Sequence, residues 1–238
     1  CLVGSEMCIR DSNMSNPVAC SNFIYQFLCS NPESVKPLIN GNSEEIHEML
    51  ALFDTIPIDW FLECIFIKTG SYELNASDVP CFSNLDSGIS RVNELLAFSH
   101  NGLTFEQLGY QLINSSTSGA RIKYGENHAK LAKLMDLVYF SSDRPAKVYP
   151  TALGNYLISV PINNKREALK KLMLRNPCIQ NLISGAHHGK IRFSDVVPFL
   201  TRSTMIRRRT SVRELITFIL EDTNMDIIQN INWEIEVQ

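Results

Sequence analysis

The feature that most constrains the fold is a pair of short β-prone runs between two helical patterns. Val138-Tyr139-Phe140 and Lys147-Val148-Tyr149 are rich in valine and aromatic residues, and a polar stretch that contains Pro145 separates them. Such runs around a turn predict an antiparallel hairpin. Before and after them, apolar residues recur at helical spacing. The sequence therefore predicts a mainly α-helical chain that carries one short β-hairpin.

The helical patterns surround this hairpin in a definite order. Apolar residues from Ile89 to Leu96 predict a first helix, and Thr104 is a good N-cap for a second. A third helix is expected from Gly125 to Val138, where the apolar residues form one stripe. Thr151 is expected to cap the last helix, Ala152 to Ile158. The predicted order is thus three helices, a hairpin and a return helix.

The segment from Lys133 to Leu157 resembles the region from recognition helix to wing in winged helix-turn-helix proteins. In that family a leucine-glycine-leucine sequence usually ends the recognition helix, and this chain has Asp136 at the glycine position. A leucine-threonine pair usually starts the last helix, and here Pro150 stands before Thr151. The resemblance implies that the hairpin is a wing and that the preceding helix enters the major groove of DNA.

A second helical region follows without an obvious wing. Its expected helices are Lys165 to Arg175, Pro177 to Ile183 and Thr204 to Leu220. The run from Ser203 to Arg213 resembles the motif that closes the paired winged-helix region found beside nucleases and ATPases of bacterial restriction systems, with Phe218 where an aromatic residue is expected. This resemblance covers residues 88 to 222. It implies a DNA-binding accessory region of a defence system and no particular activity.

These patterns divide the chain into five expected parts. Residues 1 to 12 resemble a translated sequencing adapter, so we exclude them from the fold, and the natural start is expected at Met14 or upstream. The other parts are a mostly helical N-terminal domain of unassigned function (13 to 87), a winged helix-turn-helix domain (88 to 162), a second helix-turn-helix domain (163 to 225) and a C-terminal tail (226 to 238). In the N-terminal domain, Ser43 is expected to cap a helix.

The charge is distributed unevenly, although the total is only −3. Residues 1 to 120 carry a net charge of −10, residues 121 to 213 carry +13, and residues 214 to 238 carry −6. A positive segment between acidic ends indicates a polyanionic partner, and nucleic acid is the commonest one. The alternative is that the positive segment packs against the acidic N-terminal domain.

Candidate DNA-binding side chains are basic or polar groups on the two predicted recognition helices and the wing. Arginine can form two hydrogen bonds with guanine or phosphate, and lysine pairs with phosphate. The candidates are Lys123, Asn127, Lys130, Lys133, Arg144, Lys147, Arg202, Thr204, Arg207, Arg208, Arg209 and Arg213. We expect double-stranded DNA as the partner, and a restriction nuclease, methyltransferase or ATPase subunit as a further candidate partner.

The sequence contains no phosphate-binding loop, dinucleotide fingerprint, nucleophile elbow or zinc-protease motif. The cysteines form no Cys-x-x-Cys pair, so we expect no catalytic centre, metal or cofactor. No apolar run reaches the ~20 residues of a membrane helix, and a cytoplasmic protein without a membrane anchor is expected. His128 is expected to be a surface or interface group, and His187-His188 is expected to be a solvent-exposed pair on a loop.

Two other interpretations stay open. In the first, the tandem modules bind a partner subunit instead of DNA, because winged helices also mediate protein contacts. Alternatively, the protein would be a nuclease whose catalytic part lies in the N-terminal domain or in missing sequence. The sequence does not indicate the oligomeric state.

Overall fold

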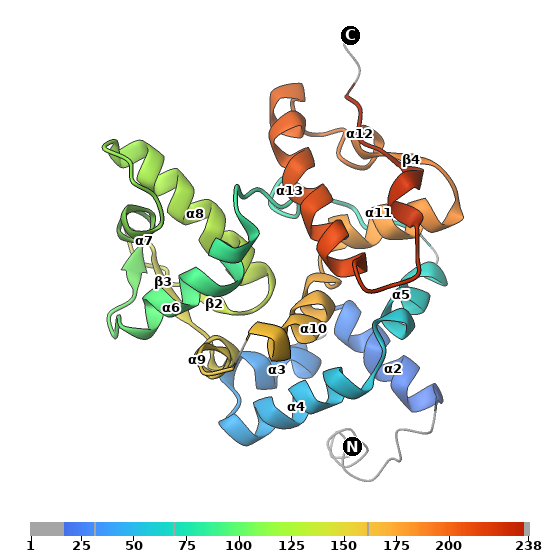
Figure 1. The fold of residues 1–238 in the computed structure, drawn as a ribbon, viewed down its shortest axis with the longest axis horizontal. Helices are drawn as coiled ribbons and strands as arrows, with labels where there is room; N and C mark the ends of the chain where they lie inside the picture. Colours follow the sequence, from blue (N-terminus) through green and yellow to red (C-terminus); the bar gives the residue numbers. More distant parts are fainter. Residues whose placement is uncertain (1–16, 31, 69, 161, 236–238) are drawn as a thin grey trace.

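The structure, a computed structural model, describes residues 17–30, 32–68, 70–160 and 162–235. The expectation for residues 1 to 12 lies outside the described residues. Within them the chain is mainly α-helical with a small antiparallel sheet, as the sequence predicts (Figure 1).

Among the described residues, four helices form the N-terminal part, and their core is aromatic. They are α2 (Pro17–Leu28), α3 (Pro32–Asn40), α4 (Ser43–Thr55) and α5 (Ile58–Phe66). Phe27 and Phe53 meet edge to face with ring centroids 4.9 Å apart, and Phe61 packs against both rings. All three side chains are fully buried. Aromatic pairs of this kind contribute ~1 kcal/mol beyond the area that they bury, so this cluster ties α2, α4 and α5 together.

Helix α4 is capped by Asn42 and not by Ser43. The Oδ1 atom of Asn42 accepts hydrogen bonds from the backbone N–H groups of Glu44 and Glu45 at 2.9 and 3.0 Å. The Glu45 carboxylate accepts one in return from the backbone N–H of Asn42. This capping box satisfies donors that the first turn leaves free. The predicted cap is wrong by one residue because asparagine and serine cap helices about equally well.

The middle part contains the predicted hairpin. Its elements are η1 (Ser87–Arg91), α6 (Val92–Ala97), β1 (Leu103–Thr104), α7 (Phe105–Leu112), α8 (Ser118–Leu134), β2 (Val138–Phe140), β3 (Lys147–Pro150) and α9 (Ala152–Ile158). Strands β2 and β3 are antiparallel, with Tyr139 opposite Tyr149. Strand β1 pairs with the other edge of β3, so the sheet order is β1-β3-β2. The caps predicted for α7 and α9, Thr104 and Thr151, are both confirmed.

Helices α7 and α8 cross at very close range. A Cβ atom on Gly109 would lie 1.8 Å from the carbonyl oxygen of Arg121, and one on Gly125 would lie 2.0 Å from that of Phe105. Neither position has room for a side chain, so the glycines set the distance between the two helices. Helix α8 begins at Ser118, a full turn or more before the predicted start, because packing against α7 holds these polar residues in the helix.

The turn after α8 depends on one left-handed residue. Asp136 has φ of 55°, a region that favours glycine and that asparagine and aspartate tolerate better than other residues. The Thr151 hydroxyl donates a hydrogen bond to the carbonyl oxygen of Asp136 and accepts one from the backbone N–H of Gly154 at 3.0 Å. The end of α8 and the start of α9 are thereby joined through a single side chain. Helix α8 therefore ends at Leu134, and Val138 belongs to β2.

The C-terminal part contains the longest described helix. Its elements are α10 (Ile162–Met173), α11 (Pro177–His188), β4 (Ile191–Arg192), α12 (Phe193–Val196), α13 (Arg202–Leu220), η2 (Ile227–Asn230) and β5 (Ile231–Asn232). Strands β4 and β5 are parallel, so residues 231 and 232 of the expected tail are part of a sheet. His187 and His188 end α11, not a loop, and the ring of His187 stacks on Phe66 at 3.7 Å. The predicted loop is wrong because contacts with α5 extend the helix, but both histidines are exposed, as predicted.

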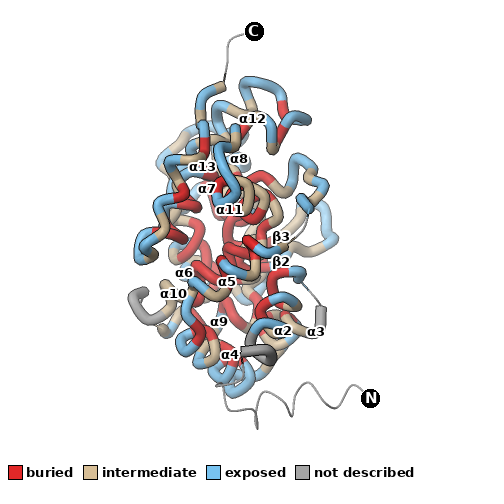
Figure 2. Tube along the Cα trace, turned by 90° about the vertical axis from the view of Figure 1, so that its right-hand side faces the viewer, coloured by how far each residue is buried: buried red, intermediate tan, exposed pale blue. Residues whose placement is uncertain are grey.

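The three parts share one core. Helix α9 contacts α3 and α4, while α10 contacts α4, α5 and α13. Buried residues from Ile24 to Ile231 form a continuous apolar cluster. Figure 2 shows the buried segments along the middle of the molecule, with exposed segments around them. The N-terminal helices therefore pack directly against both later parts.

Candidate nucleic-acid interface

Helix α8 presents its lysine side chains on one face, while Arg121 pairs with Glu106 of α7. Gly125, Ala129 and Ala132 point into the protein, because residues three or four apart share a face of a helix. Lys123 and Lys130 lie on the opposite side, and both are exposed. Asn127 and Lys133 flank them. The outward face of α8 is thus the face that the sequence assigns to DNA.

This face lines a cleft of about 500 Å³ that we call the basic cleft. Its other walls are the loop of residues 76–81 and the first half of α13. The candidate side chains that line it are Lys123, Asn127, Lys130, Lys133, Arg207 and Arg208. Asp78 and Glu126 are the acids in its lining. Five basic groups therefore face two acidic ones, and the cleft has a net positive charge.

The lysines of the basic cleft differ in their partners. Lys130 pairs with Glu126 through an Nζ–Oε1 distance of 2.6 Å, but its side chain remains 58% exposed. The ammonium of Lys133 lies 4.7 Å from the centre of the Phe140 ring. Within the described part of the chain, neither Lys123 nor Lys133 forms an ion pair. Both charges are available to an anion.

The three consecutive arginines of α13 do not form one surface. Arg208 donates hydrogen bonds to the carbonyl oxygens of Ala76 and Val79, the latter at 2.8 Å. Arg209 donates to the carbonyl oxygen of Trp233 at 3.0 Å. Successive residues of a helix point ~100° apart, so the run fans around α13. Arg207 is the arginine of the run that projects into the cleft without a backbone partner, and its guanidinium donates a long hydrogen bond, at 3.4 Å, to the hydroxyl of Thr204.

The predicted wing residues lie outside the basic cleft. Arg144 is exposed in the turn between β2 and β3. Lys147 begins β3 and is partly buried, and its backbone N–H donates to the Ser141 hydroxyl at 3.0 Å. Phe140, at the end of β2, does line the cleft. The hairpin therefore starts at the cleft and extends beyond it.

Three further candidates lie on α13 away from the cleft. Arg202 is exposed at the first position of the helix, and Arg213 is exposed in its middle. Thr204 is partly buried, and its hydroxyl accepts a hydrogen bond from Thr201 at 2.9 Å. Arg202 and Arg213, together with Arg209, lie on a second face of α13, whereas Thr204 lies on the side of Arg207, with which it forms a hydrogen bond. The predicted set is therefore divided among the basic cleft, the hairpin and this second face of α13.

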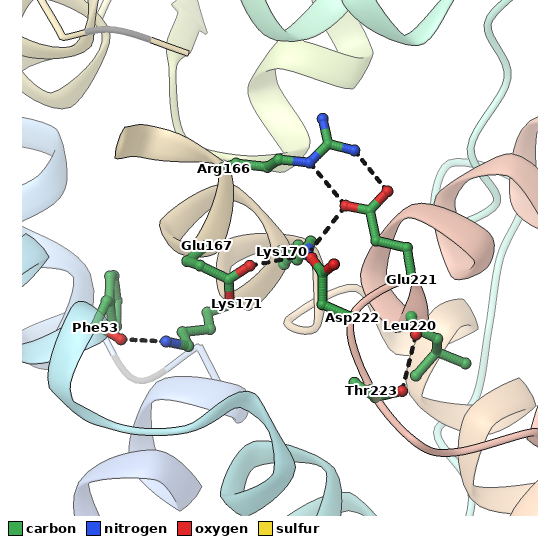
Figure 3. Close-up of polar contacts among 9 residues, drawn as sticks. All are labelled: Phe53, Arg166, Glu167, Lys170, Lys171, Leu220, Glu221, Asp222 and Thr223. Atoms are coloured by element: carbon green, nitrogen blue, oxygen red, sulfur yellow. Dashed lines mark hydrogen bonds and ion pairs between the residues drawn. The ribbon is translucent and has the colours of Figure 1, made fainter. Parts of the chain in front are cut away.

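Several other cations of the positive segment are held by ion pairs within the protein. Lys170 is 1% exposed, and its ammonium contacts the carboxylates of Glu167, Glu221 and Asp222 (Figure 3). Burial lowers the pKa of Lys170, but these carboxylates outweigh burial and raise it overall. The guanidinium of Arg166 forms two hydrogen bonds with Glu221, at 2.7 and 2.6 Å. Lys170 and Arg166 stabilise contacts within the protein, and neither residue lines the basic cleft.

Two more buried cations follow on α10 and just after it. Lys171 is 2% exposed and donates to the carbonyl oxygen of Phe53 (Figure 3). Burial lowers its pKa. Arg175 pairs with the Asp136 carboxylate, and burial lowers the pKa of Arg175 to about 10.

The acidic partners in the described ion pairs of the positive segment all lie after residue 88, namely Glu106, Glu126, Asp136, Glu167, Glu221 and Asp222.

His128 is fully buried, contrary to the surface position that the sequence predicts. Its Nδ1 donates to the carbonyl oxygen of Tyr124 at 2.8 Å, and its ring stacks on Tyr124. Burial lowers the pKa of His128, so the neutral ring is favoured. The prediction is wrong because His128 lies three residues before Leu131 and four before Ala132, so it points to the same inner face as these buried residues.

The loop of residues 76–81 is the part of the interface that the sequence did not predict. Arg208 holds two of its carbonyl groups, and the Asn176 amide donates to the carbonyl oxygen of Asp78 at 2.9 Å. These partners are about a hundred or more positions away along the chain. Local sequence carries no signal for such contacts.

No three His, Cys, Asp or Glu side chains of the described residues are grouped so that they could hold a metal ion. Among the described helices, none is long and apolar enough to cross a membrane.

Comparison of the sequence with known protein families, with curated proteins and with solved structures gave no match.

Proposed function

We propose that this chain binds double-stranded DNA through two helix-turn-helix modules, the first of which is winged. The order α6-β1-α7-α8-β2-β3-α9 is that of a winged helix, with α8 as recognition helix and the β2–β3 hairpin as wing. Helix α8 then offers Lys123, Asn127 and Lys130 to the major groove. Arg144 at the tip of the wing contacts a neighbouring phosphate.

Two local features support the winged-helix assignment. Asp136 adopts a left-handed conformation at the position where the family usually has glycine. The close crossing at Gly109 and Gly125 brings α7 against α8, as a helix-turn-helix pair requires. Asp136 lies in the segment on which the sequence resemblance rests, whereas the two glycines lie before it.

The second module consists of α10, α11 and α13 in this proposal. Helices α10 and α11 both contact α13, whose first half carries the arginine run. Among the described residues, its strands β4 and β5 are parallel and form no wing hairpin. Its contribution to DNA binding is Arg207 in the basic cleft, with Arg202 and Arg213 on the second face of α13.

The basic cleft is the observation that carries the proposal. Cations from α8 and from α13, far apart in sequence, meet there with few acids between them. Phosphate contacts of this kind supply most of the affinity of a protein for nucleic acid. We assign phosphate contacts to Lys123, Lys130, Lys133 and Arg207. Arg208 and Arg209 are left out because backbone carbonyls hold them.

Salt dependence tests the proposal directly. If four phosphates are neutralised, the affinity for a short duplex should fall about 10²-fold when the salt concentration rises fourfold. Fluorescence anisotropy of a labelled duplex measures this slope. An affinity that does not change with salt contradicts the proposal.

A variant series assigns the contacts. The triple change Lys123→Ala, Lys133→Ala and Arg207→Ala should reduce the slope of log affinity against log salt by about 3. The matched control is Lys190→Ala, an exposed cation outside the cleft, which should leave the slope unchanged. If the triple variant and the control change the slope equally, the basic cleft is not part of the DNA interface.

We further propose that the chain is an accessory or recognition part of a bacterial restriction or defence system. Its support is the resemblance of the run from Ser203 to Arg213. The protein partner would be a nuclease, methyltransferase or ATPase subunit. The neighbouring genes in a complete bacterial genome test this. Neighbours without any such gene across several genomes contradict it.

A further inference from the structure

The outer face of the three-stranded sheet carries a short aromatic row that ends at an exposed tyrosine. Tyr149 of β3 lies opposite Tyr139 of β2, and the two rings stack with centroids 5.5 Å apart and an interplanar angle of 18°. On the other side of β3, the register with β1, continued by one residue, places Gly102 opposite Tyr149. A Cβ atom on Gly102 would lie 2.8 Å from the Tyr149 ring. The row therefore runs from Gly102 through Tyr149 to Tyr139.

Tyr139 ends this row and is open to solvent. Of the strands that the structure describes, β2 is the outermost on this side of the sheet, so no further strand covers the ring. Tyr139 is 47% exposed, although Tyr149 stacks against it. Its neighbours along β2, Val138 and Phe140, point to the opposite face of the sheet, and Val138 is buried there. A flat group from solvent therefore has access to the Tyr139 ring.

A lysine on the same face lies beside the row. Because alternate residues of a strand point to the same side, Lys147 and Tyr149 share this face. Lys147 is thereby the diagonal neighbour of Tyr139 across β2 and β3, a separation of ~7–8 Å. In the described parts of the chain, no carboxylate pairs with Lys147. The exposed turn residues Asp143 and Arg144 have opposite charges, so the charge beside the row is positive.

The hairpin connects this aromatic row with the basic cleft. Phe140 lines the cleft, and it directly follows Tyr139 in β2 while it points to the opposite face. A nucleic-acid strand whose phosphates contact the cleft thus needs only to pass the edge of β2 to meet the Tyr139 ring. Stacking of a base on an aromatic side chain is a common source of affinity for single strands.

We propose that the edge of the hairpin binds one unpaired base of a DNA strand, which stacks on Tyr139 and extends the aromatic row, while a phosphate next to this base pairs with Lys147. The inference rests on the proposed function, because the adjoining duplex occupies the basic cleft. Every base has a flat face, so the site does not select a sequence. In a paired duplex the bases cover one another, so the site selects a duplex with a single-stranded end.

Duplexes that differ only at one end test the inference. One is blunt, one has a short 3′ overhang of thymidines, and one has the same overhang at the 5′ end. One of the two overhangs should bind about tenfold tighter than the blunt end in fluorescence anisotropy, as stacking of one base predicts. Its slope of log affinity against log salt should be steeper by about 0.7, because one more single-strand phosphate is neutralised. Equal affinities for the three duplexes overturn the inference.

Variants assign the preference to the aromatic row. Tyr139→Ala should reduce the ratio of overhang to blunt affinity to about one, whereas Tyr139→Phe retains the ring and should retain the ratio. The matched control is Tyr25→Ala, because Tyr25 is 50% exposed on α2 and lies outside the hairpin. It should keep the wild-type ratio. Lys147→Gln should remove the additional salt slope. A ratio that Tyr139→Ala leaves unchanged overturns the inference.

Thermal melting shows whether each variant is folded. Tyr139→Leu keeps an apolar side chain beside Tyr149 but has no ring. It replaces the alanine variant in the same measurement if Tyr139→Ala does not fold, and the ratio should again fall to about one.

A single strand with the sequence of the overhang separates the two proposals. Salt-dependent binding of the three duplexes with equal affinity overturns the inference but leaves the proposed function intact. If none of the duplexes binds, the proposed function is wrong, and the single strand then decides the inference alone. Single-strand binding that Tyr139→Ala weakens about tenfold supports the stacking site. Binding that this change does not affect, or no binding, overturns it.

Discussion

Helices α8 and α10 have similar basic sequences but opposite environments. Helix α8 lies at the edge of the molecule and α10 lies near its centre (Figure 1). Lys123 and Lys130 of α8 are exposed, whereas Lys170 and Lys171 of α10 are buried. The difference arises because α10 contacts α4, α5 and α13 around its circumference, while α8 contacts protein mainly along its small-residue face.

The comparison shows why net charge along a sequence is a weak measure of surface charge. On α10, buried cations need carboxylate or carbonyl partners, because an unpaired charge in the interior is very unfavourable. Glu167, Glu221 and Asp222 supply them for Lys170. On α8 water supplies the solvation, and the charge stays available to a ligand. The same residue type thus stabilises the fold in one helix and forms the candidate interface in the other.

The largest expected effect is at the cation that follows α10. Asp136→Ala removes the carboxylate from Arg175, whose side chain is 10% exposed, and places alanine at a left-handed position. The free energy of unfolding should fall by about 3–5 kcal/mol. Urea unfolding measures it. Asp136→Gly should lose about 1 kcal/mol less than Asp136→Ala, since glycine tolerates this backbone. A loss below that of an ordinary surface change would contradict the buried pair.

Two adjacent lysines on α10 sharpen the comparison further. Lys170→Met should reduce the free energy of unfolding by about 2 kcal/mol, since three partly exposed carboxylates lose their shared cation. Lys171→Met should change it by less than about 1 kcal/mol, because a buried lysine with one carbonyl partner contributes little net stability. The same substitution one position apart is its own control. Equal losses would show that burial, and not the carboxylates, determines the effect.

The pH dependence separates two glutamates that bracket the end of α13. Hydrogen bonding with Arg166, opposed in part by burial and supported by Lys170, lowers the pKa of Glu221. The folded state therefore binds fewer protons there than the unfolded state, and this contribution to stability is lost as pH falls through the folded pKa. Glu221→Gln should flatten the loss of stability on acidification, as measured by melting temperature against pH.

Glu214 is the control of opposite sign. Burial raises its pKa, so the folded state binds a proton more readily than the unfolded state and gains stability there on acidification. Glu214→Gln should therefore make the decline of stability with acid steeper. Parallel profiles for the two variants would contradict both assignments.

The smallest expected effect on stability is on α8. Lys123→Ala combined with Lys130→Ala should change the free energy of unfolding by less than about 0.5 kcal/mol, since the exposed Lys130–Glu126 pair contributes little. The double variant should nevertheless bind DNA more weakly, and its slope of log affinity against log salt should be smaller than that of the wild type. Chemical unfolding and anisotropy on the same samples check both. A substantial loss of stability would mean that α8 resembles α10 after all.

Local signals in the sequence predicted much of the middle part. The hairpin and the caps Thr104 and Thr151 depend on residues close in the chain, and the structure contains all of them. Strand β1 was missed because two residues are too few for a periodic pattern. The early start of α8 was missed because contact with α7, and not helix propensity, stabilises its first turns.

The candidate site was predicted less completely than the fold. Lys130 and Lys133 were found because helical spacing identifies an outward face, whereas Lys123 lies before the predicted start of this helix. The role of Arg208 was missed because its partners, Ala76 and Val79, are more than a hundred residues away in the chain. No spacing rule distinguishes an arginine that binds a ligand from one that holds a loop.

The contact between α7 and α8 is made by backbone, because Gly109 and Gly125 leave no side chains between the helices. The distance and angle between them are thus independent of the residues on the outer surface of α8. Lys123, Asn127 and Lys130 can be exchanged for other polar groups without disturbing the geometry that presents them. A library randomised at these positions would vary ligand preference while each member keeps the same scaffold.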